Sequence, residues 1–381
     1  MPILLLAVIG AIFLLDGYIP YEVKSQIFAL SLLVKSVIIF TLPFVIFMLL
    51  FKTVAKLSSG ATKVIMLVLG GVCCSNFLST MVSYQIGSAI YHMDLSLAVP
   101  ADVEGLLPAW SATVPSIASN DIAMFSGLIL GVLSSQLVPG VASTICAVFD
   151  RVVAVAFKVL TCIVPIFIAG FVLKLNHDKV IHTIAQDYAV IFALVALSLA
   201  GYIACIYLVS SRFSLSRFGA SVKNMFPAAI AGFSSMSSAA AMPLTIMGAE
   251  KNSANPMLAR LSIPTTVNIH LIGDCFAIPI FAFAVMKNYG MPEPLFYSYF
   301  IFALYFVLAK FSVAAIPGGG ILVMLPILES QLGFTAEMGS MITALYILFD
   351  PVITCANVLG NGGFAMALDR IQSVKALPET G

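Results

Sequence analysis

The chain has 381 residues, of which 61% are hydrophobic and 9% charged, with a formal net charge of +1 and a mean hydropathy of +1.09. About a quarter of the residues of a typical soluble domain are charged, so this composition excludes a soluble globular protein and indicates a polytopic membrane protein. The near-zero net charge gives no reason to expect a nucleic-acid partner. The sequence carries no Walker loop, HExxH or G-x-S-x-G motif, so we expect neither an ATP-driven pump nor an enzyme.

Gaps in the charge pattern predict about eight membrane-spanning helices, because each span needs about 20 apolar residues. The predicted spans cover residues 3–16, 28–51, 64–91, 122–148, 152–173, 188–210, 259–286 and 336–364. The first of them lacks the basic region and cleavage site of a signal peptide, so we interpret it as a short spanning helix.

Two further apolar segments are poor spanning helices. Residues 224–249 contain FSSMSSAAAMP, in which four serines are followed by small residues and a proline, and residues 311–328 contain PGGG. Non-helical backbone at membrane depth is tolerated only inside protein or against a water-filled cavity, so we interpret both segments as re-entrant hairpins at a transport site. The expected fold is all-α, with about eight transmembrane helices and two re-entrant helical hairpins.

Loop charges predict the orientation. Two groups of basic residues contain no acid: Lys52, Lys56 and Lys63, and Arg212, Arg217 and Lys223. One loop contains only acids, namely Asp94, Asp102, Glu104 and Asp121. The positive-inside rule then places both termini in the cytoplasm, the first hairpin entering from the cytoplasm and the second from outside. Short loops are typical of a bacterial inner-membrane protein.

The two hairpins suit a bound ligand. Serine hydroxyls and freed backbone N–H groups of the first hairpin can hold a carboxylate, because both donate hydrogen bonds where water is scarce. The alternative is that serine and alanine simply allow close helix packing. The glycines of the second hairpin let backbone approach a ligand and let the hairpin move as a gate, which favours binding.

Four polar residues are predicted to share one face of the last helix. Asp350, Thr354, Asn357 and Asn361 follow one another at spacings of four, three and four. A carboxylate inside the membrane is costly and marks a functional site, so we expect Asp350 to hold a substrate ammonium or a cation. Asn357 and Asn361 can offer neutral oxygens to a hard cation. The alternative, a structural Asp–Lys pair, lacks a partner on the same helix.

A second polar pair lies in NIHLIGDCF, where His270 and Asp274 are four residues apart on one face of a predicted apolar helix. They can share a proton, coordinate a cation or pair with each other, and the alternative for His270 is a packed, hydrogen-bonded side chain. A zinc site is not predicted, because no second His/Cys pair has ligand spacing. We interpret the polar run at residues 75–80 as helix packing rather than as ion ligands.

The order of SSAAAMPLT, IPGGGILVML and the Asp350–Thr354–Asn357 helix resembles the glutamate-transporter-like family of dicarboxylate/amino acid:cation symporters, also called sodium:dicarboxylate symporters. The resemblance is specific over about residues 224–370 and weaker over 1–223. It implies a homotrimer formed through a scaffold domain and a transport domain that moves as an elevator. The expected divisions are early transport and scaffold helices in 1–93, an external loop in 94–121, the trimerisation scaffold in 122–215, a transport core in 216–372 with hairpins near 224–250 and 305–335, and a tail in 373–381.

The resemblance also implies roles for individual residues. The serine pair of the first hairpin falls on Ser237 and Ser238, and the tip of the second on Pro317, Gly318 and Gly319. The aspartate that binds the substrate amino group falls on Asp350, the threonine beside the substrate on Thr354, and the asparagine that holds the substrate backbone on Asn357.

The departures from the family pattern change the expected substrate and coupling ion. The family arginine that pairs with an acidic side chain falls on Ile353, which favours a neutral substrate. The family's sodium motif is Asn-Met-Asp-Gly-Thr, and the corresponding residues here run from His270 to Asp274, of which only Gly273 is kept. Two further carboxylates that bind sodium in the family correspond to Tyr346 and Asn361. We therefore expect reduced Na⁺ coupling or H⁺ coupling through His270, Gly273, Asp274, Asn357 and Asn361, with no other cofactor.

The resulting hypothesis is a secondary symporter of a neutral amino acid, embedded in the lipid bilayer. An acidic amino acid or dicarboxylate remains an alternative substrate if Lys310 reaches the site. A channel or non-transporting receptor on the same scaffold is a second alternative, with Ile353, Tyr346 and Asn361 marking lost coupling. A membrane-embedded enzyme that uses His270 and Asp274 is a third.

Overall fold

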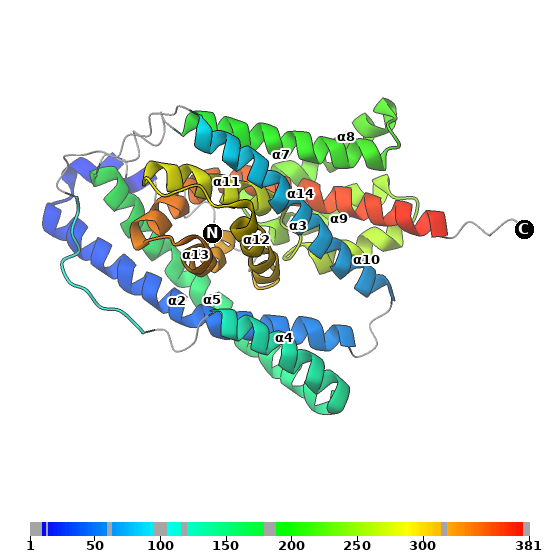
Figure 1. The fold of residues 1–381 in the computed structure, drawn as a ribbon, viewed down its shortest axis with the longest axis horizontal. Coiled ribbons are helices and arrows are strands. Elements are labelled where there is room, and N and C mark those ends of the chain that lie inside the picture. Colours follow the sequence, from blue (N-terminus) through cyan, green and yellow to red (C-terminus); the bar gives the residue numbers. More distant parts are fainter. Residues whose placement is uncertain are drawn as a thin grey trace, which may run out of the picture.

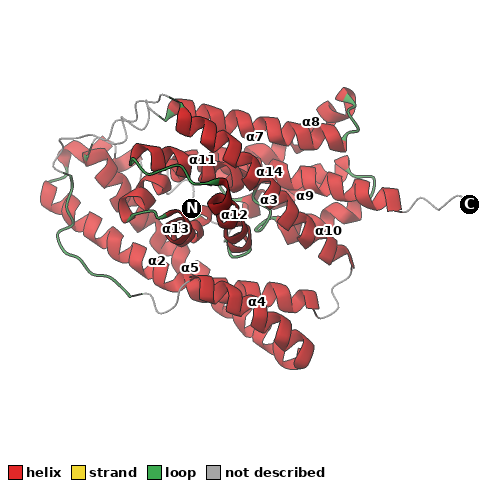
Figure 2. Ribbon diagram, viewed as in Figure 1, coloured by secondary structure: helices red, strands yellow, loops and turns green. Residues whose placement is uncertain are grey.

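The computed structural model describes residues 10–12, 14–58, 63–93, 105–115, 120–178, 188–313 and 318–375, and this part of the chain contains helices and no strand (Figure 2). Most of the predicted span 3–16, most of the acidic loop, Pro317 and the end of the tail lie outside the described residues. After a short turn, η1 (Asp16–Tyr18), the helices are α2 (Tyr21–Ser58), α3 (Lys63–His92), α4 (Asn120–Leu137), α5 (Pro139–His177), α7 (Ala189–Ser210), α8 (Leu215–Ser235), α9 (Ser238–Asn252), α10 (Pro256–Thr266), α11 (Ile272–Asn288), α12 (Phe296–Lys310), α13 (Gly319–Leu332) and α14 (Ala336–Lys375).

Several of these helices can cross a membrane. Within the described ranges, five segments are long and apolar enough: Tyr21–Lys52, Leu67–His92, Pro139–Ala156, Ala189–Ser210 and Glu337–Ile371. Four of them coincide with the predicted spans 28–51, 64–91, 188–210 and 336–364. This supports an integral membrane protein.

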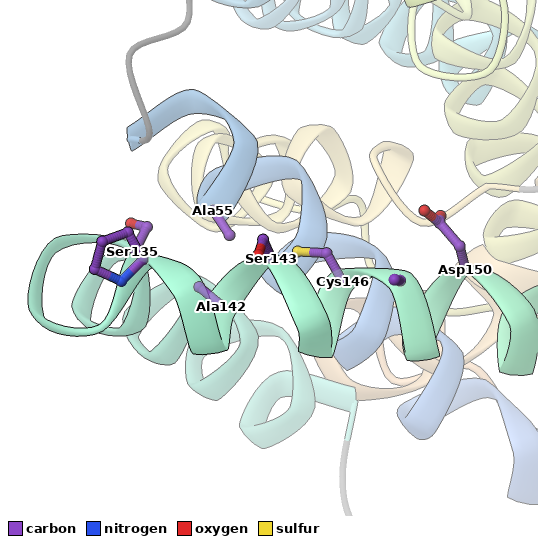
Figure 3. A pocket seen from close by; sticks show the side chains of 8 residues that line it. Ala55, Ser135, Ala142, Ser143, Cys146 and Asp150 are labelled. Carbon is purple, nitrogen blue, oxygen red and sulfur yellow. The ribbon is translucent and has the colours of Figure 1, made fainter.

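The predicted boundary between spans 122–148 and 152–173 is wrong. The chain breaks earlier, at Val138, and α5 begins at Pro139, whose missing N–H is tolerated in a first helical turn. The charged residues that suggested a loop lie inside α5, and Asp150 pairs with Lys52 of α2 at 2.5 Å. Figure 3 shows Asp150 on α5 beside a pocket of about 230 Å³ between these two helices.

The predicted span 259–286 is not one helix. It is divided into α10 and α11 by a break at Val267–Leu271, so His270 lies in the break and Asp274 in the first turn of α11. The prediction that both lie on one face of a continuous helix is therefore wrong. Polar side chains of neighbouring helices hold this break, as described below.

Two pairs of helices form hairpins at the expected places, with longer first arms. The first pairs α8 with α9 around Met236, a non-glycine residue with φ of 49°, and its first arm begins at Leu215 instead of 224. The second pairs α12 with α13, and its first arm begins at Phe296 instead of 305. The charge of Lys310 concealed this arm, because a buried lysine looks like a helix boundary in a hydropathy pattern.

The helices pack in two groups (Figure 1). Helix α2 packs against α4 and α5, and Cβ atoms at Gly127 and Gly131 of α4 would overlap the backbone of α2 at Phe47 and Phe51. In the second group, α14 packs against α7, α8, α9, α10, α11 and α13, and α3 packs against α10, α11 and α12. Helix α7 lies in this second group, although the expected scaffold of residues 122–215 included it.

Candidate functional site

One small cavity lies between the turn of the first hairpin, the start of α13, the α10–α11 break and the middle of α14. Its volume is about 30 Å³, which is room for about two water molecules. The lining residues come from segments far apart in the chain: Met236, Ser238, Val267, Asn268, Leu271, Asp274, Val313, Gly320, Tyr346, Asp350, Thr354 and Asn357. The cavity thus brings together five of the predicted site residues, namely Ser238, Asp274, Asp350, Thr354 and Asn357.

Asp350 is buried beside the second hairpin. Its Oδ2 accepts a hydrogen bond of 3.1 Å from the backbone N–H of Gly318, and its Oδ1 accepts one of 3.0 Å from the Thr354 hydroxyl. Among the described residues, no lysine, arginine or histidine lies within ion-pair distance of this carboxylate. Asp350 is therefore a buried acceptor whose present partners are neutral, and an entering ammonium can pair with it.

The two serines of the first hairpin have different roles. The Ser237 hydroxyl accepts a hydrogen bond of 3.3 Å from the N–H of Ala240 and so caps α9, while its own N–H donates to the Ser235 hydroxyl. Ser238 is buried and lines the cavity at the N-terminus of the 15-residue α9. The partial positive charge of that helix end favours an anionic group here.

Glycines let the second hairpin approach the rest of the site through its backbone. Gly318 has φ of +73°, which favours glycine, and Gly319 begins α13. A Cβ on Gly320 would overlap both the carboxylate of Asp274 and the hydroxyl of Tyr346. The hairpin thus packs directly on α11 and α14, and a larger residue at position 320 would hold it away.

Asp274 is the centre of a buried polar cluster. Its Oδ1 accepts a hydrogen bond of 2.7 Å from the Tyr346 hydroxyl, and its Oδ2 accepts one of 2.9 Å from Nδ2 of Asn357. The Nζ of Lys310, at the end of α12, lies 3.5 Å from the same Oδ1, and the two side chains are 0% and 2% exposed. Sequence reasoning missed this ion pair, because Lys310 was considered only as a partner of the substrate.

The break between α10 and α11 is held by two asparagine side chains. Asn76 of α3 donates to the carbonyl of Ile269 at 2.7 Å and accepts from the N–H of Leu271 at 3.2 Å. Asn361 of α14 donates to the carbonyl of His270 at 3.2 Å and accepts from Thr266. These bonds replace helical hydrogen bonds that the break removes, and Asn361 is not among the residues that line the cavity.

His270 and Asp274 have separate partners. The Nε2 of His270 lies 2.8 Å from the hydroxyl of Ser75, and its ring packs on Phe364 at 4.6 Å between centroids. His270 is buried, and its environment fits the packed, hydrogen-bonded alternative better than a pair with Asp274. Gly273 is needed for close packing, since a Cβ there would overlap the carbonyl of Ile353, and its N–H donates to Oδ1 of Asn357 at 2.8 Å.

Comparison with known proteins identifies the family of the chain. The model of the sodium:dicarboxylate symporter family matches residues 3–371, nearly the whole chain. Serine/threonine transporters named SstT, from three strains of Acinetobacter baumannii, are 22% or 23% identical to the chain over 359 residues. Each match covers 86% of this chain and 86% of the relative.

Proposed function

The chain belongs to the sodium:dicarboxylate symporter family, and we propose that it is a secondary carrier that moves a neutral amino acid together with a cation. Proteins of this family are transporters and not enzymes. The observation that carries the proposal is the cavity between the two hairpin turns, which contains a buried carboxylate, Asp350, with neutral partners. Such a site suits a zwitterion whose ammonium needs a counter-charge inside the membrane.

The two charged groups of the amino acid would occupy opposite sides of the cavity. The ammonium would bind Asp350 and displace the N–H of Gly318 from its Oδ2. The carboxylate would lie at Ser238 and the first turn of α9, where hydroxyl and backbone N–H donors meet the positive end of a helix. Thr354 and the remaining N–H of Asn357 would complete the hydrogen bonds of the substrate.

A neutral side chain is favoured over an acidic one. The carboxyl groups that line the cavity are those of Asp274 and Asp350, while Lys310 lies beside Asp274 and does not line the cavity. Ile353, at the position of the family arginine, is buried beside Gly273. A side-chain carboxylate would be buried without a partner, which is costly. The names of the A. baumannii relatives, serine/threonine transporters, also favour small neutral amino acids.

Transport would follow the domain movement implied by the family. We assign α2, α4 and α5 to a scaffold and α3 with α7–α14 to a moving transport domain, because each group is packed within itself and the two groups meet mainly where α13 contacts α2 and α14 contacts α5. The hairpins would re-enter the membrane as gates. An exposed apolar face of α5, including Val148, Val152, Val155 and Val159, would join three copies in a bacterial inner membrane, with both termini in the cytoplasm.

The test is thermal stabilisation of the purified protein by twenty amino acids and common dicarboxylates, in sodium and in choline salts. Binding to the folded state raises the melting temperature by mass action. We expect stabilisation by small neutral amino acids such as L-serine or L-threonine, and none by L-aspartate or succinate. Stabilisation by the acidic ligands alone would overturn the assignment and favour the dicarboxylate alternative.

A further inference from the structure

We propose that the ammonium of Lys310 is a built-in cation, which holds the second hairpin closed on Asp274 and makes amino-acid binding independent of sodium. This inference rests on the proposed function and identifies Lys310 as the source of one positive charge at the site. The ion pair joins Lys310, the last residue of α12, to Asp274 in the first turn of α11.

Burial makes Lys310 dependent on Asp274. The lysine side chain is 0% exposed, and its Nζ lies 3.5 Å from Oδ1 of Asp274 and 4.5 Å from the centre of the Phe306 ring. A buried ammonium is costly unless a counter-charge and favourable dipoles surround it. Asp274 supplies the charge, while the aromatic face and the C-terminal end of α12 add favourable electrostatics.

The ion pair between Lys310 and Asp274 joins the second hairpin to the helix bundle. Lys310 ends the first arm, and Gly320, in the first turn of the second arm, packs against the same carboxylate oxygen, Oδ1 of Asp274. Asp274 is in turn bonded to Tyr346 and Asn357 of α14. One carboxylate therefore connects both arms of the hairpin with the helix that carries the substrate residues, as a bound monovalent cation between hairpin and helix would do.

Nearby oxygens leave little room for a sodium ion. Both oxygens of Asp274 already accept hydrogen bonds, and Oδ1 of Asn357 accepts from Gly273. Oδ1 of Asn361 accepts from Thr266. Sodium at Asp274 would lie beside the ammonium of Lys310 and be repelled by it. Since the lysine satisfies the charge of Asp274, the carboxylate of Asp350 is left for the substrate ammonium.

The experiment measures thermal stabilisation of the full-length protein by L-serine and L-threonine at fixed pH, in sodium chloride and in choline chloride. The wild type should respond equally in both salts. In K310M, Asp274 loses its counter-charge, so stabilisation should become sodium-dependent, with apparent affinity in choline weaker by at least about tenfold. In the double variant K310M/D274N both charges are absent, so sodium should have no effect.

Lys52→Met is the matched control, because Lys52 also pairs with an aspartate but lies between α2 and α5, away from the site. This variant should keep the sodium-independent response. A wild-type response that requires sodium, or a K310M response equal to wild type in choline, would overturn the inference and leave the proposed function intact. Absence of stabilisation by every ligand in both salts would overturn the proposed function itself. If K310M alone does not fold, a sodium-dependent response in the double variant still contradicts the inference.

Discussion

The backbone N–H of Gly318 donates a 3.1 Å hydrogen bond to Oδ2 of Asp350, which joins the tip of the second hairpin to the middle of α14. The cavity between them has room for about two waters, so an amino acid can enter only when one of the hairpins moves. An ammonium that replaces the Gly318 N–H on Asp350 would couple substrate binding to the position of this hairpin. On the proposed function, the same contact would link the binding group to the gate.

Replacing Asp350 with Asn should abolish amino-acid binding while the protein still folds. The amide keeps the shape and the acceptor oxygen for Gly318 or Thr354, but it removes the negative charge that pairs with the ammonium. We expect a loss of affinity of about a hundredfold or more, as for a buried charge pair. Substrate-induced thermal shift measures it. D150N, on the exposed part of α5, is the control and should bind normally; normal binding by D350N would contradict the site.

Replacing Gly320 with Ala should keep the second hairpin from closing. The added methyl group would overlap the Asp274 carboxylate and the Tyr346 hydroxyl, neither of which can retreat within the packed bundle. Uptake and substrate-induced stabilisation should both fall steeply. Gly201→Ala is the control, since its Cβ meets open space on α7, and it should leave uptake unchanged or stabilise the helix by up to about 1 kcal/mol. Uptake by G320A at the level of G201A would disprove this close contact.

Replacing Asn361 with Ala should lower stability rather than sodium affinity. The change removes the side-chain donor to the His270 carbonyl and leaves the Thr266 hydroxyl only the 3.4 Å bond to the Ile263 carbonyl, at a cost of about 1–3 kcal/mol. N76A should behave alike, because Asn76 bonds to Ile269 and Leu271 in the same break. Thermal unfolding in sodium and in choline is the measurement. If the N361A variant lost stability only in the sodium salt, Asn361 would instead be a ligand of the ion.

Alanine substitutions of the two serines of the first hairpin should have different effects on binding and on stability. S238A should weaken amino-acid binding, because this residue lines the cavity. S237A should mainly destabilise α9 by about 1 kcal/mol, because the Ser237 hydroxyl caps the helix. Melting temperatures with and without L-serine distinguish the two results. Equal loss of binding in both variants would show that the serines act as a pair, as the family resemblance implies.

The sequence predicted those parts of the fold that depend on local patterns. Gaps between charges located α2, α3, α7 and α14, and the spacing of Asp350, Thr354 and Asn357 predicted the three side chains that share the cavity. The hairpins were located by their serines and glycines. All of these features are properties of a few neighbouring residues, which is why one sequence was sufficient.

Features that depend on distant partners were missed. The break at Val267–Leu271 is concealed in an apolar segment, because the groups that satisfy it are side chains of Asn76 and Asn361 on other helices. The pairing of Lys310 with Asp274 was missed for the same reason, since hydropathy treats a lysine as a boundary whatever counter-charge it meets in the fold. Burial energetics explain both, but only after the helices are placed.

The decisive measurement is uptake of L-serine into proteoliposomes that contain the purified protein, with an imposed gradient of sodium or of protons. A carrier should accumulate the amino acid above its external concentration while an ion gradient exists, and D350N should not. Equilibration without accumulation under every gradient would contradict coupled transport and indicate a channel on the same scaffold.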